Sequence, residues 1–207
     1  MTRLVPLALL VLTPALLPAQ SSDYTLAGSA VAVYNLVGEA TIQGGTGSDV
    51  TVQVTLTGKD AGQLKVETTE IRGRRALMVR YPEDQIVYRP LGRGSNTRLS
   101  IRDDGTWGSW TSDDRDDHGR RHSDSRQITV RGDGSGTEAS ANLRIMVPAG
   151  KRIAVFVGVG RVDISNVDGD LMVDAASANI AARGTRGTLD LDTGSGDLQI
   201  DGSEGNA

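Results

Sequence analysis

Aspartates recur among the apolar residues of the C-terminal third, and their spacing is the first feature of the sequence that suggests chemistry. Asp190 and Asp192 stand two residues apart in "GTLDLDTGSGDLQIDG", and Asp174 precedes Asp192 by eighteen residues. A glycosidase needs two such carboxylates at a set separation in a concave site. Because these acids alternate with apolar neighbours, strand geometry predicts that they lie on an outward, solvated face. We therefore predict no catalytic residue, but an acidic strip of Asp174, Asp190 and Asp192 that either binds cations or a cationic polymer or only keeps the protein soluble.

Both tryptophans of the chain lie in a densely charged segment, residues 103–126, that interrupts the strand-like pattern. Amphipathic aromatic side chains usually cover the edge of a core. The favoured interpretation is that Trp107 and Trp110 pin this segment to the β body, and the alternative is that they expose an adhesive surface. Both residues therefore join the acidic strip as candidate binding residues.

Two further patterns resemble metal sites without completing one. His118 and His122 have the spacing of a helical zinc pair, but Gly119 and the surrounding like charges disfavour a helix, and the spacing indicates no third ligand. Asp49 and Asp197 stand in glycine-rich turns, yet each precedes an apolar residue directly and is out of the register of a calcium-binding nonapeptide. We predict no metal and no cofactor.

A nine-residue period runs through residues 151–207. Each unit reads as a turn followed by a short apolar-x-apolar strand. The similarity is stronger at eighteen residues, because Asn166 lines up with Gly184 and Gly202, in turns that require a positive φ. One unit cannot bury its apolar face alone, so the period predicts a stacked array. The predicted fold is all-β, a β-solenoid or β-helix-like stack of nine-residue strand–turn units with about eighteen residues per coil.

The same alternation predicts which side chains point inward and which point outward. The inward set is Val162, Ile164, Leu171, Val173, Ile180, Leu189, Leu191, Leu198 and Ile200. The outward set is Asp163, Met172, Asp190 and Gln199.

Residues 21–150 are rich in strand patterns but lack the strict period. No helical stripe is apparent there, and no Pro/Ser-rich linker separates this part from the repeats. We predict one β domain over residues 21–207, irregular over 21–150 and regular over 151–207. The predicted irregular strands are Ala30–Val37, Val50–Leu56, Leu64–Glu67, Ala76–Tyr81, Arg98–Arg102, Arg126–Arg131 and Ala141–Val147.

The first twenty residues have the anatomy of a secretory signal peptide. Arg3 is followed by an apolar run that is too short and too interrupted by proline to span a membrane, and small residues follow it. We predict cleavage near residues 19–21, export to the periplasm, cell envelope or medium, and no transmembrane segment after cleavage. With no cysteine, the exported fold has no disulfide, and a formal charge of −4 gives no footprint for nucleic acid.

Three stretches resemble an adhesin-like β-strand-repeat family of bacteria whose function is not established: "AVYNLVGEATIQGGTGSDVTVQV", "LRIMVPAGKRIAVFVGVGRVDISNVDGDLMVD" and "TGSGDLQIDG". The resemblance implies a secreted or envelope-associated, non-enzymatic adhesin or scaffold, whose partner would be an envelope polymer, a cell surface or another envelope protein. The sequence ends at Ala207 in mid-repeat, so it is expected either to be a fragment or to lack a cap on its last coil. A carbohydrate-active β-helix enzyme with paired aspartates stays the alternative, and a calcium-stabilised module is a weaker one.

Overall fold

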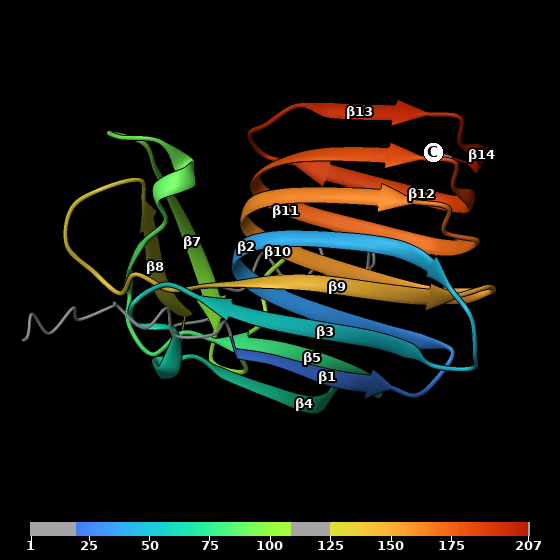
Figure 1. Cartoon of the computed structure of the whole chain (residues 1–207), viewed down its shortest axis with the longest axis horizontal. Helices are drawn as coiled ribbons and strands as arrows, with labels where there is room; N and C mark the ends of the chain where they lie inside the picture. Colours follow the sequence, from blue (N-terminus) through green and yellow to red (C-terminus); the bar gives the residue numbers. More distant parts are fainter. Residues whose placement is uncertain (1–19, 109–124, 207) are drawn as a thin grey trace, which may run out of the picture.

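The structure is a computed structural model that describes residues 20–108 and 125–206. Within these residues the chain is all-β, with two single-turn 3-10 helices, η1 (Ala61–Gln63) and η2 (Arg89–Leu91), and no α-helix. The predicted signal peptide and much of the charged segment lie outside the described residues. The strands form one large sheet and one three-stranded sheet (Figure 1).

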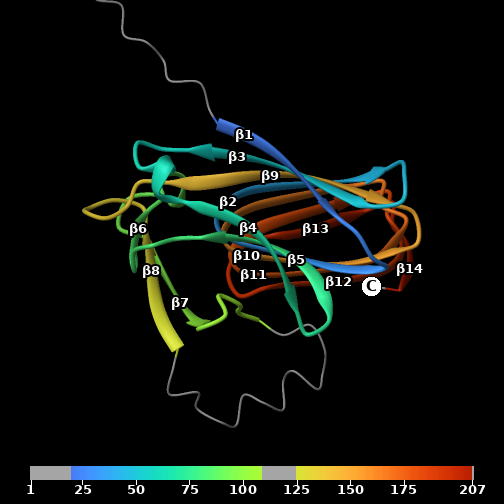
Figure 2. The same cartoon turned by 90° about the horizontal axis from the view of Figure 1, so that it is seen from below.

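Six parallel strands form the body of the large sheet, which we call the stack (Figure 1). They are β2 (Ala30–Gly45), β10 (Lys151–Ser165), β11 (Gly169–Arg183), β12 (Arg186–Thr193), β13 (Leu198–Asp201) and β14 (Glu204–Asn206). From β10 onward each residue pairs with the residue eighteen positions later: Ile153 with Leu171, and Leu171 with Leu189. The layers superpose when the molecule is seen from below (Figure 2). The sequence similarity at eighteen residues is thus the spacing of stacked residues.

Of the turns that the nine-residue period predicts, only every second one is present in the long strands of the stack. Asn166, Gly184 and Gly202 do take positive φ angles of 54°, 59° and 57° in successive layers, as predicted. The intervening turn, however, does not exist in β10 and β11, where Gly160 and Ala178 lie inside continuous fifteen-residue strands. A Cβ on Gly160 would collide with the carbonyl oxygen of a stacked glycine in β2, so a glycine lets this strand bend while the backbones stay in contact.

The inward set is buried as predicted in β10 and β11, but fails in the last strand. Val162, Ile180 and Leu171 are at most 2% exposed, and Leu191 is partly buried. Leu198 and Ile200 are instead 47% and 44% exposed. Each layer is covered by the next, and among the described residues no layer covers β13.

The other end of the stack is closed by antiparallel strands. Strands β1 (Gln20–Leu26), β3 (Val50–Thr57) and β9 (Ser140–Pro148) pair antiparallel, and β9 then lies parallel to β2. The hairpin of β4 (Lys65–Ile71) and β5 (Arg74–Arg80) joins β2 through β5. All seven irregular strands predicted from sequence overlap observed strands, whereas β1 and β6 were missed and β2 is longer than expected.

The second sheet consists of β6 (Gln85–Val87), β8 (Ser125–Arg131) and β7 (Asn96–Arg102), in that order. Several of its buried side chains, among them Leu99, Ile101 and Ile128, belong to the same apolar cluster as those of the stack. This sheet stands beside the layers, with η2 between its first two strands in the chain (Figure 1).

Candidate functional site

The three aspartates of the acidic strip lie on neighbouring strands. Asp174 of β11 pairs with Asp192 of β12, and Asp190 pairs with Met172. Asp190 and Asp192 are exposed, while Asp174 is half-buried and its carboxylate lies next to Gly108. Stacked strands are about 4.8 Å apart, so Asp174 and Asp192 are close neighbours along the stack.

Trp107 lies in the core rather than on an open surface. Its side chain is 6% exposed and meets Tyr34 edge-on at 5.4 Å between ring centroids, while Tyr34 stacks on Phe156 at 4.4 Å. The loop around it is held by Arg102, whose guanidinium donates to the carbonyl of Gly108 at 2.9 Å. Burial raises the pKa of Tyr34 to about 12, with the negative charge of a nearby aspartate adding to the effect. Trp110 lies outside the described residues.

In the described part of the chain, no group of three or more His, Cys, Asp or Glu side chains that could hold a metal ion comes together. Asp197 is exposed, and its backbone N–H donates to Asn179 Oδ1 at 2.9 Å. Asp49 is half-buried in the turn directly before β3. His118 and His122 lie outside the described residues.

A groove of about 790 Å³ lies between the stack and the η2 turn with the start of β7, and sequence reasoning missed it. Glu39, Arg161 and Asn179 line it from the stack, and Tyr88, Leu91 and Asn96 line it from the opposite side. Ligand sites in proteins usually have a volume in this range. The groove is therefore the candidate binding site of the described structure.

The floor of the groove is a polar ladder. Glu39, Arg161 and Asn179 occupy equivalent positions of β2, β10 and β11, and Arg161 on the middle strand pairs with Glu39 on one side and Asn179 on the other. The backbone N–H of Glu39 donates to Asn142 Oδ1 at 3.0 Å. The Arg161 guanidinium donates to both oxygens of Asp163, at 2.6 and 2.8 Å. This hydrogen bonding lowers the pKa of the Asp163 carboxyl and raises the pKa of Arg161, so the pair is fully charged at neutral pH.

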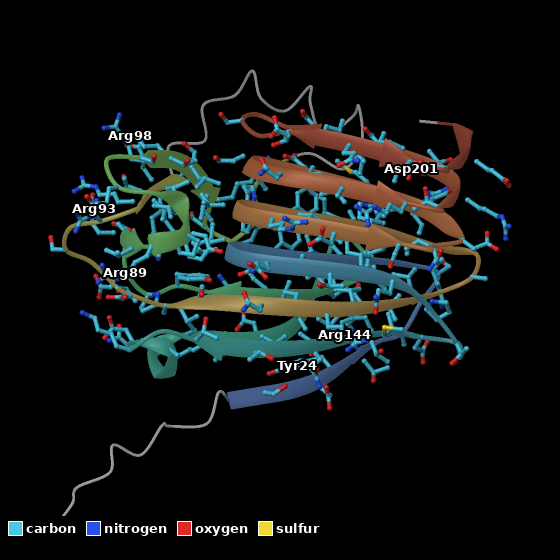
Figure 3. The ribbon with its side chains drawn as sticks, turned by 45° about the horizontal axis from the view of Figure 1, so that its top comes forward. Tyr24, Arg89, Arg93, Arg98, Arg144 and Asp201 are labelled. Atoms are coloured by element: carbon cyan, nitrogen blue, oxygen red, sulfur yellow. The ribbon has the colours of Figure 1, made fainter. Side chains whose placement is uncertain are left out.

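The opposite wall is partly apolar and is anchored from behind. Tyr88 is half-buried, and burial followed by the charge of Glu39 raises the pKa of its phenol. Leu91 belongs to η2, which is held by a two-pronged ion pair from Arg89 to Glu138 at 2.7 and 3.0 Å. Figure 3 shows Arg89 pointing outward from this side, away from the stack, so its charge does not enter the groove.

One signal for the groove was present in the sequence. Gly160, Ala178 and Gly196 recur eighteen residues apart, and a polar residue follows each of them. A strict nine-residue period would place these small residues in turns, but Gly160 and Ala178 lie within strands, where the polar residues that follow them stack on one face. The opposite wall, from residues 88–97, had no detectable relation to the repeat.

Comparisons with known proteins add little to this geometry. No family model matches the chain, and no curated protein matches it. Among solved structures it is similar to the crystal structure of a "putative cell adhesion protein" from Clostridium sporogenes, at 6% identity and a TM-score of 0.34, over 92% of this chain and 96% of that one. The resemblance to an adhesin-like family thus rests on the sequence motifs alone. The described residues contain no helix long and apolar enough to cross a membrane.

Proposed function

We propose that this chain is an exported, non-enzymatic β-solenoid of the bacterial envelope, acting as an adhesin or as a scaffold. The observation that carries the proposal is the eighteen-residue register, which places equivalent side chains in columns along the stack. A column repeats one contact at the strand spacing of about 4.8 Å. Repeated weak contacts of this kind suit an extended partner such as an envelope polymer, because linked contacts reinforce one another.

The groove supports binding rather than hydrolysis. Cleavage of a glycosidic bond requires two carboxyl groups that flank the bond. Glu39 is the one acid among the described residues that line this groove. A polymer held here would contact hydrogen-bonding groups and an apolar wall without a second acid to complete the reaction.

The acidic strip is a second contact surface under this proposal. Asp174, Asp190 and Asp192 place three acidic residues on two neighbouring strands, an arrangement that suits a divalent ion or a cationic polymer. The partner of the strip would therefore differ in charge from the partner of the groove.

The test combines export and adhesion. We expect the full chain, expressed in a bacterium, to leave the cytoplasm with a new N-terminus between residues 19 and 21, as measured by mass spectrometry of the exported fraction. We also expect the purified protein to co-sediment saturably with isolated bacterial envelopes. Retention in the cytoplasm without processing, or no co-sedimentation with envelopes of any bacterium tested, contradicts the proposal.

A further inference from the structure

We infer that the groove between the stack and the η2 turn binds an uncharged glycan chain. Its biological meaning rests on the proposed function, but the binding itself does not. Three features of the groove suit such a ligand: the regular polar floor, the apolar part of the wall and the balance of charge.

The floor offers hydrogen-bonding groups of both kinds in fixed positions. Arg161 donates, Glu39 accepts and Asn179 does both, and the three pair directly on adjacent strands. Their backbones are held by inner strands of the sheet, so the spacing of these groups does not relax when a ligand leaves. A sugar presents hydroxyl groups that both donate and accept, and so it can use every member of this ladder.

The wall supplies a surface for the apolar faces of sugar rings. Tyr88 presents a half-buried ring with a polar tip, and Leu91 and Pro90 lie beside it in the lining. An aromatic side chain with one apolar face and one hydroxyl group suits a ligand with C–H faces and a hydroxyl rim. A groove of about 790 Å³ has room for several such rings in a row.

The charge in the groove favours a neutral ligand over an acidic one. Arg161 donates to both oxygens of Asp163 and is also attracted by the charge of Glu39, so its positive charge is shared between two carboxylates. Arg93 and Arg98 point away from the stack on the far side of the second sheet (Figure 3). Because Arg161 is shared between Asp163 and Glu39, it is a weak attractor for a carboxylated glycan, which would also meet repulsion from Glu39.

An extended peptide fits the floor less well than a glycan. Arg161 already pairs with Glu39 on one side and Asn179 on the other, so the floor strands have no free edge to which a peptide strand could add. The start of β7 lies at the edge of the second sheet, and a peptide could pair only there. Peptide binding is thus the outcome that competes with the inference.

The experiment is calorimetric titration of the purified protein with defined probes. The neutral probes are cellohexaose, xylohexaose, maltohexaose and N-acetylchitohexaose, the acidic probe is hexagalacturonate, and the peptide probe is an extended Thr/Ser/Gly decapeptide. We expect at least one neutral probe to bind with a Kd below about 1 mM, and the acidic probe to bind at least about tenfold more weakly.

Two groove variants and one matched control locate the binding. Asn179→Trp fills the groove from an exposed position and should abolish binding, while Tyr88→Ala should weaken it at least about tenfold. Gln199→Trp introduces the same side chain at an exposed position of the stack outside the groove and should bind like the wild type. Thermal unfolding curves identify any variant that fails to fold.

Failure of the inference differs from failure of the proposed function. Absence of binding by all neutral probes, unchanged binding in Asn179→Trp, or tighter binding of the decapeptide overturns the inference. If the wild type and Asn179→Trp co-sediment equally with envelopes, adhesion stands and the groove is not its glycan site. If the neutral probes bind and no envelope does, the inference stands and the proposed function fails.

Discussion

At the scale of single residues, Gly160 shows how a missing side chain determines the path of a strand. Its φ of 152° disfavours other residues, and a Cβ there would collide with the carbonyl oxygen of Gly38 in the adjacent layer. Gly150 also has a positive φ, of 75°, but a Cβ there would meet nothing within 4 Å. A substitution at Gly150 therefore measures backbone strain alone, whereas one at Gly160 measures strain together with a steric collision.

We expect Gly160→Ala to lower the free energy of unfolding by about 3 kcal/mol, since strain and overpacking add. Gly150→Ala should cost only about 1 kcal/mol, because strain acts there alone. Urea denaturation of both variants measures the difference. Equal losses in the two variants would show that β10 moves away from β2 without penalty.

The phenol of Tyr34 gives the fold an alkaline limit. Because burial raises its pKa from 10.0 to about 12, the folded state keeps this proton where the unfolded chain releases it. The contribution is fully present below pH 10 and is lost as the pH rises toward 12, on the order of 2 kcal/mol in all. Tyr34→Phe should flatten the fall of stability over this window. Burial also raises the pKa of Tyr81, so part of the alkaline loss should persist in the variant.

The acidic strip is tested by replacing its three carboxylates with amides of the same shape. In the triple variant Asp174→Asn, Asp190→Asn and Asp192→Asn, we expect the fold to survive and the binding of polylysine at low salt to weaken. We also expect stability to depend less on calcium and on salt, by up to about 1 kcal/mol.

Three scattered acids provide the control for net charge. Glu83→Gln, Asp168→Asn and Asp201→Asn remove the same charge from exposed positions that are not neighbours of one another. If this control weakens polylysine binding as much as the strip variant does, the effect belongs to net charge, and the strip only keeps the protein soluble.

At the scale of elements, the stack is thinnest toward its last layers, where β12 contributes one fully buried side chain, against long buried runs in β2 and β10. Leu189 of β12 is 5% exposed and lies over Leu171 of β11. Leu189→Asp would place a charge without a partner against this apolar column and should lower stability by at least about 3 kcal/mol. Thr188→Asp, one residue earlier at an exposed position, should cost less than about 1 kcal/mol. Thermal melting of both variants is the measurement, and equal melting temperatures would contradict the inward register.

The sequence predicted the register of the stack but not all of its members. The turn residues Asn166, Gly184 and Gly202 and the apolar columns depend on local spacing, so the period alone was enough to find them. The turn predicted at Gly160 was wrong, because glycine permits both a turn and a tight bend within a strand. Strand β2 was not expected inside the stack, since it lies about 120 residues before β10 and outside the period.

The acidic strip could be predicted from local spacing, whereas the groove could not. The neighbouring positions of Asp174 and Asp192 follow from the eighteen-residue spacing. The groove needs residues 88–97 to stand opposite the polar ladder, and that arrangement depends on how the second sheet packs. No spacing in a single sequence carries this information, because the packing joins segments that share no pattern.

At the scale of the whole molecule, the two ends of the stack are unequal. Antiparallel strands close one end, while β13 exposes Leu198 and Ile200 at the other. An apolar strand edge tends to pair with another copy, and burying one such side chain is worth about 1.5–3 kcal/mol. We expect the purified protein to self-associate with increasing concentration in sedimentation velocity.

Matched lysine variants test whether β13 is the contact. Leu198→Lys with Ile200→Lys should restore a monomer, since charged side chains protect edge strands. Gln199→Lys with Asp201→Lys adds the same side chains to the other face of the same strand and should leave the association largely intact. If the wild type is monomeric at all concentrations, the prediction that β13 mediates self-association is wrong.

The pairing of β2 with β10 also gives the molecule an order of assembly. These strands lie about 120 residues apart, so bringing them together closes a long loop, whereas each later layer closes a loop of only eighteen residues. The first closure therefore costs more conformational entropy, and the layers beyond it can follow by addition onto an existing template. A chain made from its N-terminus has β2 in place before β10 emerges, so growth of the stack proceeds in one direction, away from the closed end.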